Sequence, residues 1–345
     1  MQLYNKLSSD ERSKLIDASK NIRITLSFYK YAKINYPNKF RNKLFIEWNQ
    51  LDVLGRIYIA YEGINAQLSI PSKNFTRFEK FLNSIPILKH IRLNIAAEQD
   101  NKSFLKLTIK VKDKIVADGL QDNTFDVTNK GAHLDAKEFN QLMKENNSVV
   151  IDMRNHYESE IGHFRGAVLP DVDTFRDSLE IIEKQMSEHK ENKNLLMYCT
   201  GGIRCEKASA YFKHKGFKNV YQLEGGIIEY VRQVKEENLE NNFLGKNFVF
   251  DNRRVEKISD DIIAACHQCG CSFDIHTNCA NDACHLLFIQ CDNCKEKMEN
   301  CCSYKCLEIK KMPYRLQKKL RSGQKNSNDI FKKGRTKNIT TFKKR

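Results

Sequence analysis

The sequence lacks several features that would assign a protein to a membrane or to an export route. No window of its 345 residues approaches the roughly 20 apolar residues that a membrane-spanning helix needs. The first segment, MQLYNKLSSDERSKLIDASK, has no succession of basic, apolar and small residues of the kind that marks a secretory signal. No internal repeat is recognisable. We therefore expect a cytoplasmic protein that has no membrane partner.

What is present is the composition of a folded protein, with 41% hydrophobic and 29% charged residues. The net charge of +15 is concentrated near the C-terminus, because residues 309–345 contain 14 Lys or Arg against one acid, Asp329. We expect so polar a segment to be disordered and to attract the phosphates of a nucleic acid. The alternative is a solvated tail that only aids solubility.

The order of strand-like and helical patterns divides the chain into five segments. Residues 1–22 are predicted to form a lead-in helix. Residues 23–120 follow the order βαββαβ with one further strand, which predicts a ferredoxin-like or acylphosphatase-like α+β sandwich. In residues 130–240, short apolar strands alternate with amphipathic helices, which predicts a doubly wound parallel α/β sheet. Residues 241–306 are predicted to form a cysteine-rich module, and residues 307–345 form the basic tail.

Ten of the 12 cysteines lie in the cysteine-rich module. In a reducing compartment, thiols at this density bind metal more often than they form disulfides. CHQC and CDNC are two Cys-x-x-Cys knuckles that are 21 residues apart, close to the spacing of zinc ribbons. We predict structural zinc, with thiols enough for two ions; an iron–sulfur cluster is the alternative, and His267, His276 and His285 are further candidate ligands. The candidate cysteine ligands are Cys266, Cys269, Cys271, Cys279, Cys284, Cys291, Cys294, Cys301, Cys302 and Cys306.

A second signal is the segment LLMYCTGGIRCEKASAYF, in which an apolar strand ends at Cys199 and a helix follows. The first N–H groups of a helix form an anion site, and a thiolate placed there has a lowered pKa. Ligands of parallel sheets bind at the carboxyl ends of the strands, so Cys199 is the candidate catalytic nucleophile. The loop predicted to cradle an anion or substrate beside it consists of Thr200, Gly201, Gly202, Ile203 and Arg204.

The loop between Cys199 and Arg204 is one residue shorter than that of cysteine phosphatases and resembles the rhodanese family, whose cysteine carries a persulfide. VVIDMRNHYESEIGHFRGAV and YQLEGGIIEY resemble two further rhodanese signatures. GRIYIAYEGINAQLSIP, FLKLTIKVKDKIVADGL and the pattern CHQCG…HTNCANDACHLLFIQC complete a set that is similar to the bacterial tRNA uridine hydroxylase family. The resemblance covers roughly residues 23–306 and leaves out the basic tail.

This resemblance implies oxygen-dependent 5-hydroxylation of the wobble uridine, position 34, of tRNA. It implies tRNA as the partner through its anticodon loop, molecular oxygen as co-substrate, and Cys199 as a persulfide carrier or nucleophile. No iron facial triad, flavin fingerprint or haem site is recognisable, so the residues leave oxygen activation and the electron donor open. One alternative is a persulfide-carrying sulfurtransferase that acts on thiosulfate or in tRNA thiolation. Another is an RNA-binding zinc protein whose rhodanese domain is inert.

Four residues near the loop are candidates for supporting roles. Cys205 either resolves a persulfide or disulfide on Cys199 or packs the helix against the sheet, and we favour packing. His163 is expected to support the loop by hydrogen bonding. Asp152 and Arg154 form either a structural ion pair or a substrate contact.

A protein that modifies tRNA also needs groups that stack on an unpaired base and groups that contact phosphate. Tyrosines of the predicted strands are stacking candidates, although aromatic residues in strands more often form core: Tyr29, Tyr31, Tyr58 and Tyr61. Lysines that alternate along one strand form a solvated face and are candidate phosphate contacts: Lys106, Lys110, Lys112 and Lys114. Glu206 and Lys207, which follow Cys205, are expected to be ordinary charges on the solvent face.

Overall fold

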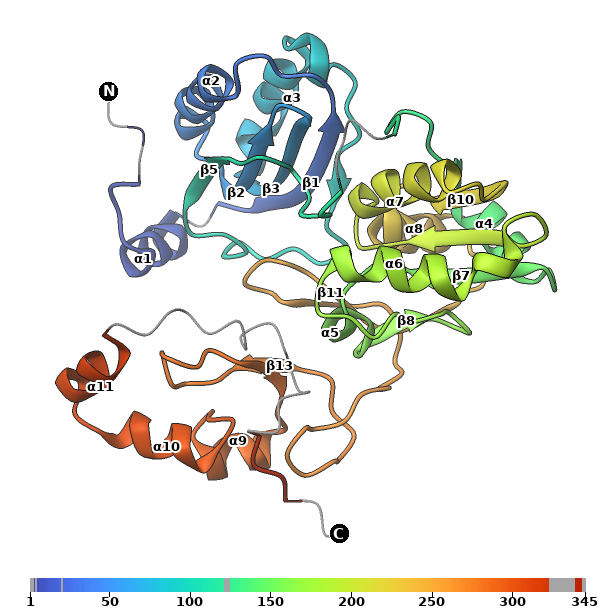
Figure 1. The fold of residues 1–345 in the computed structure, drawn as a ribbon. Helices are drawn as coiled ribbons and strands as arrows, with labels where there is room; N and C mark the ends of the chain where they lie inside the picture. Colours follow the sequence, from blue (N-terminus) through green and yellow to red (C-terminus); the bar gives the residue numbers. More distant parts are fainter. Residues whose placement is uncertain (1–2, 4, 20, 121–124, 323–338, 343–345) are drawn as a thin grey trace.

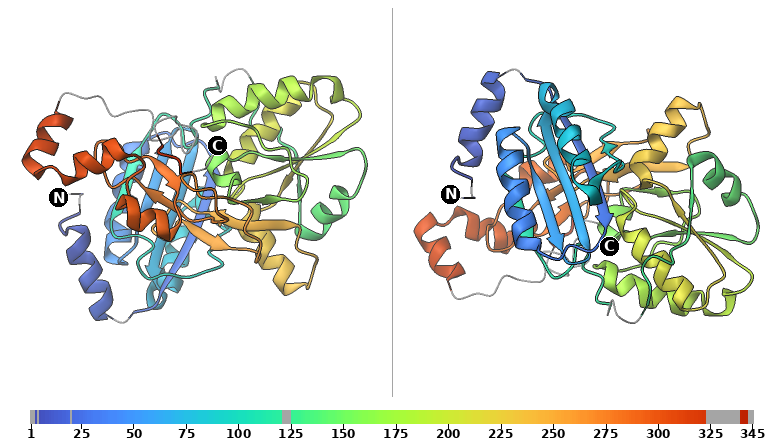
Figure 2. Two further views of the ribbon diagram at one scale, coloured as in Figure 1. Left: turned by 90° about the horizontal axis from the view of Figure 1, so that it is seen from below. Right: turned by 90° about the horizontal axis from the view of Figure 1, so that it is seen from above.

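The chain folds into three units, which Figure 1 shows in a computed structural model. The structure describes residues 3, 5–19, 21–120, 125–322 and 339–342. In Figure 1 the N-terminal unit lies above the cysteine-rich unit, and the middle unit lies beside both. Figure 2 shows the same arrangement from below and from above. The predicted lead-in helix is α1 (Ser9–Ser19), whose Ile16 packs against Leu54 and Phe104 of the N-terminal unit.

The N-terminal unit is a five-stranded sheet with two helices on one face. Its elements are β1 (Arg23–Tyr31), α2 (Pro37–Gln50), β2 (Leu54–Ala60), β3 (Gly63–Pro71), α3 (Phe75–Asn83), β4 (Asn94–Ile95) and β5 (Leu107–Val111), with short 3-10 turns at Ser72–Asn74 and Pro86–Leu88. The strand order is β4-β1-β3-β2-β5, with β5 parallel to β2 and the other neighbours antiparallel. The predicted ferredoxin-like sandwich with one further strand is confirmed.

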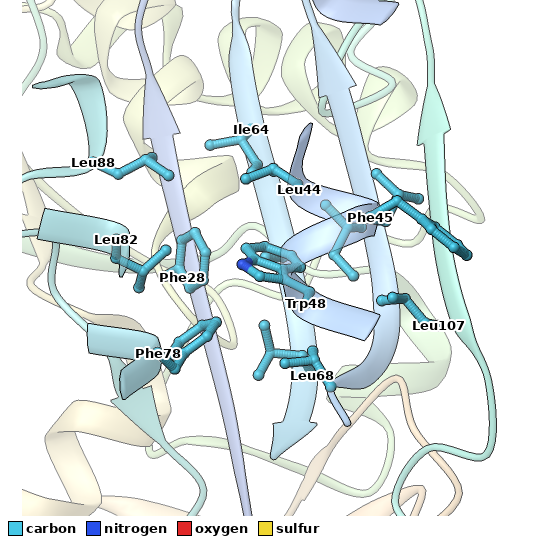
Figure 3. Packing of buried hydrophobic residues seen from close by; sticks show 14 of the residues in the cluster. Phe28, Leu44, Phe45, Trp48, Ile64, Leu68, Phe78, Leu82, Leu88 and Leu107 are labelled. Carbon is cyan, nitrogen blue, oxygen red and sulfur yellow. The ribbon is translucent and has the colours of Figure 1, made fainter. Parts of the chain in front are cut away.

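The core of this unit lies between the sheet and its two helices, as Figure 3 shows. Trp48 of α2 has its ring centroid 6.3 Å from that of Phe28 and 5.6 Å from that of Phe78. Successive residues of a strand point to opposite faces, so Leu26 and Phe28 join this core, whereas Ser27 and Tyr29 lie on the face that carries no helix. That second face is available to the rest of the protein.

The middle unit is a parallel sheet covered by helices on both faces. Its elements are β6 (Ala132–Leu134), α4 (Ala136–Met143), β7 (Ser148–Asp152), α5 (His156–Ser159), β8 (Gly162–Phe164), α6 (Phe175–Gln185), a 3-10 turn (Ser187–His189), β9 (Asn194–Tyr198), α7 (Ile203–His214), β10 (Asn219–Leu223) and α8 (Gly226–Glu236). The sheet order is β6-β10-β9-β7, and every pair is parallel. Helices α6 and α7 pack into one core and α4 and α8 into another, which confirms the doubly wound fold.

The cysteine-rich unit begins on the middle unit rather than after it. Its elements are β11 (Phe243–Phe248), β12 (Val255–Lys257), β13 (His276–Asn278), β14 (Leu287–Ile289), α9 (Asp292–Met298), α10 (Tyr304–Lys311) and α11 (Tyr314–Arg321). Strand β11 pairs with β12 on one side and, antiparallel, with β8 on the other. A side chain at Gly162 of β8 would lie 2.1 Å from the carbonyl oxygen of Lys246, so this close pairing requires glycine.

The expectation of a disordered tail is wrong for the parts of residues 307–345 that the structure describes. The helices α10 and α11 occupy most of residues 304–321, and the side chain of Ser303 caps α10 by accepting a hydrogen bond from the backbone N–H of Cys306. Ile339 is buried against Cys279 and Cys302, and Thr340 N donates to the Cys302 carbonyl. The cysteine cluster supplies an apolar surface that the tail's own composition does not reveal. The remainder of the predicted tail, 323–338 and 343–345, lies outside the described residues.

Within the described part of the chain, no helix is both long enough and apolar enough to cross a membrane.

Candidate active site and metal centres

Cys199 follows the last residue of β9 and lies at the N-terminus of α7. The backbone N–H of Gly202 donates to the Cys199 sulfur at 3.2 Å. Gly202 has φ +95°, and a side chain there would lie 2.8 Å from the Tyr29 hydroxyl. The backbone conformation and the close approach of the N-terminal unit both require glycine at this position. The sulfur therefore lies where the first N–H groups of a helix converge.

The environment of Cys199 favours its thiolate. Burial alone raises the pKa of this thiol, but hydrogen bonds from the Cys205 side chain and from the N–H groups of Cys205 and Arg204, together with the Arg204 charge, outweigh it. The pKa of Cys199 falls to about 6. Burial and the neighbouring Cys199 instead raise the pKa of Cys205 well above its ordinary range. At neutral pH, Cys199 is thus the thiolate and Cys205 the protonated donor beside it.

This difference predicts the pH dependence of alkylation at Cys199. A depressed pKa means that the reactive thiolate is lost only as the pH falls through about 6, so the rate with iodoacetamide should reach half its plateau near pH 6. An ordinary cysteine reaches this point near about 8.5. Mass spectrometry of the peptide that contains Cys199 measures this rate separately from the other thiols. The Cys205→Ala variant should shift the midpoint upward, because it removes one hydrogen-bond donor to the thiolate; a wild-type midpoint above about pH 8 would contradict the geometry.

Arg204 is held by a residue that the sequence analysis missed. Its two terminal nitrogens lie 2.7 and 2.8 Å from the two oxygens of Glu158, which is fully buried in α5. Burial raises the pKa of Glu158, but the charge and hydrogen bonds of Arg204 outweigh it and lower this pKa overall. Glu158 also accepts from the N–H of Asn155, and this capping box, visible in the sequence as Asn155-x-x-Glu158, is the signal that marks its place. The bidentate pair fixes the guanidinium beside Cys199.

Asp152, Arg154 and His163 lie in the layer behind the loop. Arg154 and Asp152 are both fully buried, with nitrogen and oxygen 2.6 Å apart, and the Tyr198 hydroxyl donates to Asp152 at 2.7 Å. This places them together as an ion pair inside the domain, with no side-chain surface for a substrate. His163 Nδ1 lies 2.9 Å from the Ser159 carbonyl oxygen, a contact within the segment that carries Glu158.

Glu206 and Lys207 lie in the interface with the N-terminal unit, so the expected solvent-face position is wrong. Lys207 Nζ lies 2.5 Å from Glu62 and 2.6 Å from Asp118, and the lysine side chain is fully buried. Glu206 accepts from the Tyr29 hydroxyl at 3.1 Å. The helix-free face of the N-terminal sheet covers this side of α7, which a pattern read within one domain does not show. These ionic contacts fix the sheet over the Cys199 loop.

A cavity of about 290 Å³ lies between that sheet face and the loop. Its size is at the lower end of the range of small-molecule sites, about 300–1,000 Å³. Cys199 and Arg204 line one side, and residues of the segment between β11 and β12 close another, so all three units contribute. The polar and aromatic residues that the N-terminal sheet contributes to the lining include Tyr29, Arg56, Tyr58, Asn65, Gln67 and Asn94.

A second cavity, of about 310 Å³, shares Tyr29 and Asn94 with the first. Basic side chains gather along it: Lys30, His90, Arg92, Lys130 and His133. Glu206 and Glu224 balance part of this charge through ion pairs with Lys130 and Arg92. Of the tyrosines considered for base stacking, Tyr31 lines this cavity, whereas Tyr61 is 67% exposed and lies outside the lining of both. Lys106, Lys110, Lys112 and Lys114 also lie outside both linings.

Eight of the ten candidate ligand cysteines form two sets of four sulfurs. Within each set all sulfurs lie within 4.8 Å of one another. The first set joins the two Cys-x-x-Cys knuckles, as the spacing predicts. The sets are Cys266, Cys269, Cys291 and Cys294, and Cys279, Cys284, Cys302 and Cys306.

The geometry of both sets suits a tetrahedral metal ion. Zinc–sulfur bonds of about 2.3 Å at tetrahedral angles give sulfur–sulfur distances of about 3.8 Å. The Cys269–Cys291 sulfurs are 3.5 Å apart, and those of Cys284 and Cys302 are 3.7 Å apart. The N–H of Cys291 donates to the Cys266 sulfur at 3.4 Å, a contact that stabilises a thiolate. Both sets could therefore hold a metal ion.

The remaining candidates fall outside these two sets. Cys271 is exposed, and the Cys301 sulfur donates to the Glu299 carbonyl at 3.8 Å. His267 Nε2 lies 2.7 Å from a carboxylate oxygen of Glu160, the residue that follows α5, so it links the cysteine-rich unit to the middle unit. Among the described residues, neither cysteine set includes His276 or His285.

Comparison with protein families agrees with this division into units. Residues 23–115 match the UPF0176 acylphosphatase like domain, residues 135–233 match the rhodanese-like domain, and residues 244–307 match the rhodanase C-terminal domain. The fold and the Cys199 loop thus define a rhodanese-like protein with an N-terminal acylphosphatase-like domain.

Three relatives extend over nearly the whole chain. A protein of Leptospira interrogans is 53% identical over 96% of this chain and 90% of its own length. One of Pectobacterium carotovorum is 53% identical over 96% of this chain and 94% of its own, and one of Photorhabdus laumondii is 51% identical over 96% and 95%. Each is named tRNA uridine(34) hydroxylase. This chain belongs to the tRNA uridine(34) hydroxylase family.

Proposed function

We propose that this protein is a tRNA-modifying oxygenase that hydroxylates carbon 5 of uridine 34. The observation that carries the proposal is a complete Cys199 cradle facing a cavity of about 290 Å³ in a member of this family. In the reaction, the C5–H of uracil becomes C5–OH with one oxygen atom of O₂. The other oxygen atom leaves as water, with two electrons and two protons from an external donor.

Cys199 is the proposed catalytic residue, as a thiolate nucleophile or as the carrier of a persulfide. Its pKa of about 6 supports either role, because both need the deprotonated sulfur at neutral pH. The loop 200–203 and Arg204 form the proposed cradle for the anion or substrate beside that sulfur. Glu158 positions Arg204, and Cys205 donates a hydrogen bond that keeps Cys199 ionised.

The anticodon loop is the proposed site of contact with tRNA. Uridine 34 is unpaired there, so its base can leave the stack at little cost. The cavity beside Cys199 offers Tyr29 and Tyr58 to the base, and the second cavity, across Tyr29, offers Lys30 and Lys130 to the flanking nucleotide. The mature tRNA pool is cytoplasmic, and we propose the same location for this protein.

The basic surface of α11 is proposed to contact tRNA phosphates. Truncation after Cys306 would not test this, because it also removes Ile339 from the cysteine cluster. The double variant Lys318→Ala/Lys319→Ala removes two exposed charges and leaves that packing intact. We expect tRNA affinity to fall several-fold and the slope of log K against log salt to decrease by about two, measured by filter binding. Lys137→Ala/Lys184→Ala, on α4 and α6, changes the net charge equally and should change neither.

Structural zinc is the proposed occupant of the two four-cysteine sets. Four thiolates in tetrahedral arrangement are the donor set of structural zinc sites, and they would close a unit whose apolar core is small.

The experiment that tests the function is mass spectrometry of tRNA nucleosides. Cells that lack this protein and the same cells supplied with it are compared under air. We expect 5-hydroxyuridine and its derivatives only in cells that contain the protein. If 5-hydroxyuridine is unchanged and 2-thiouridine falls instead, the scaffold is a sulfurtransferase and the proposal is wrong.

A further inference from the structure

Asn94 forms part of the wall between the two cavities. It begins β4 and pairs with Ser27 of β1, at the end of the sheet that covers the Cys199 loop. The residue is only 4% exposed. The side-chain nitrogen donates to the Gly201 carbonyl at 3.4 Å, whereas the side-chain oxygen Oδ1 has no hydrogen-bond partner among the described residues.

The orientation of this amide is fixed by chemistry. The Gly201 carbonyl oxygen can only accept a hydrogen bond, so the NH₂ group of Asn94 must face it. The opposite orientation would set two acceptors against each other. Oδ1 is therefore the atom left unpaired, and a buried acceptor without a donor is costly. Buried polar atoms of this kind call for a specific explanation, and here the atom belongs to a residue that lines the substrate cavity.

No described residue donates to Oδ1, so a hydrogen-bond donor on a molecule bound in the cavity is the candidate partner. Uracil carries a hydrogen on N3, whereas cytosine carries a lone pair at the same ring position. A hydrogen-bond acceptor held in a fixed position accepts from N3–H of uracil and is repelled by the N3 lone pair of cytosine. Asn94 is fixed, because it is held by the strand pairing with Ser27 and by the bond to Gly201, two residues after Cys199.

We propose that Asn94 is the residue that selects uracil, through a hydrogen bond from N3–H of the base to Asn94 Oδ1. The inference rests on the proposed function, since it assigns a role to a residue in the same cavity. Asn94 acts on binding and specificity. The chemistry at C5 remains with Cys199.

The test uses 17-nucleotide anticodon stem-loops that differ only at position 34. They carry uridine, 3-deazauridine, in which C–H replaces N3–H, or 2′-deoxyuridine. Affinities for wild-type protein and Asn94→Ala are measured by competition. With wild-type protein we expect 3-deazauridine RNA to bind about tenfold more weakly than uridine RNA, the effect of one lost hydrogen bond and an unpaired acceptor. With Asn94→Ala the two RNAs should bind within about twofold, since neither then leaves a buried acceptor unpaired.

The readout is a ratio of two affinities, and the fold of Asn94→Ala is checked by circular dichroism, because an unfolded variant would also bind the two RNAs alike. Asn65→Ala is the matched control, because Asn65 lines the same cavity and its amide donates to the Ile115 carbonyl. It should keep the tenfold preference. Equal binding of uridine and 3-deazauridine RNA to wild-type protein would overturn the proposal without any variant. A preference for uridine over 3-deazauridine that persists in Asn94→Ala would also overturn it. So would a variant that loses only the preference for uridine over 2′-deoxyuridine, because that result would assign Asn94 to the ribose.

Failure of the proposed function gives a different pattern. Wild-type protein would then form no 5-hydroxyuridine in tRNA, whatever the affinities. The preference for uridine over 3-deazauridine would still report on Asn94.

Discussion

Cells that carry Cys199→Ala in place of the wild-type protein should lose 5-hydroxyuridine from their tRNA. Removing the nucleophile of a catalytic cysteine or serine site commonly lowers the rate by more than about a thousandfold, because the remaining groups act only through it. Here the Gly202 N–H and the Arg204 charge would point at a methyl group. The measurement is mass spectrometry of nucleosides from tRNA of complemented cells. The protein level is checked by immunoblot.

Cys205→Ala is the matched control for this loss. Both cysteines are fully buried in the same cluster, so the two substitutions change packing by similar amounts. We expect Cys205→Ala to retain 5-hydroxyuridine at a reduced level, since it raises the pKa of Cys199 without removing its sulfur. If Cys199→Ala also retains the nucleoside, Cys199 is not the catalytic residue.

Loss of metal should unfold the cysteine-rich unit. We expect two zinc ions per chain by elemental analysis and one in Cys294→Ala, which removes a ligand from the first set only. Structural zinc contributes about 10–16 kcal/mol to the folding of small domains, more than a unit of this size can replace. A strong chelator should therefore abolish the protection of this unit from proteolysis while the two other units stay folded.

Cys271→Ala is the control for metal content. Cys271 is exposed and lies outside both sets, so this variant should keep both ions and its resistance to proteolysis. Iron in place of zinc would favour the alternative of an iron–sulfur cluster. The absence of any bound metal in protein purified without chelator would refute the assignment.

The elements that sequence patterns predict well are those that local interactions determine. The capping box of Asp135 and Glu138 marks the start of α4, and both of its hydrogen bonds are present. The order βαββαβ follows from alternating side chains and turn residues. The Cys199 loop is recognisable because strand, glycines and arginine lie within a few residues of one another. In each case the interacting residues are close in sequence, so a local sequence pattern is enough to predict the structure.

The features that the sequence does not reveal depend on distant contacts. The sequence around Lys207 is typical of a solvent-exposed helix position, but in the fold the N-terminal unit covers this lysine and Glu62 pairs with it. Ile339 resembles part of a polar tail until it meets the cluster of Cys279 and Cys302. The side-chain oxygen of Asn94 is seen to be unpaired only in the folded protein, where the side-chain nitrogen donates to the Gly201 carbonyl. Each depends on contacts between segments that are far apart in the sequence, which no local pattern contains.

The order of the two cysteine sets along the chain has a consequence for assembly. Going from Cys266 to Cys306, the pairs belong alternately to the first set and the second, so each set encloses a segment that carries ligands of the other. The two sets therefore cannot be divided between two separate peptides. The first set is incomplete until Cys294 has been synthesised, and the second until Cys306. Binding of an ion to one set therefore also restrains the segment that carries two ligands of the other set.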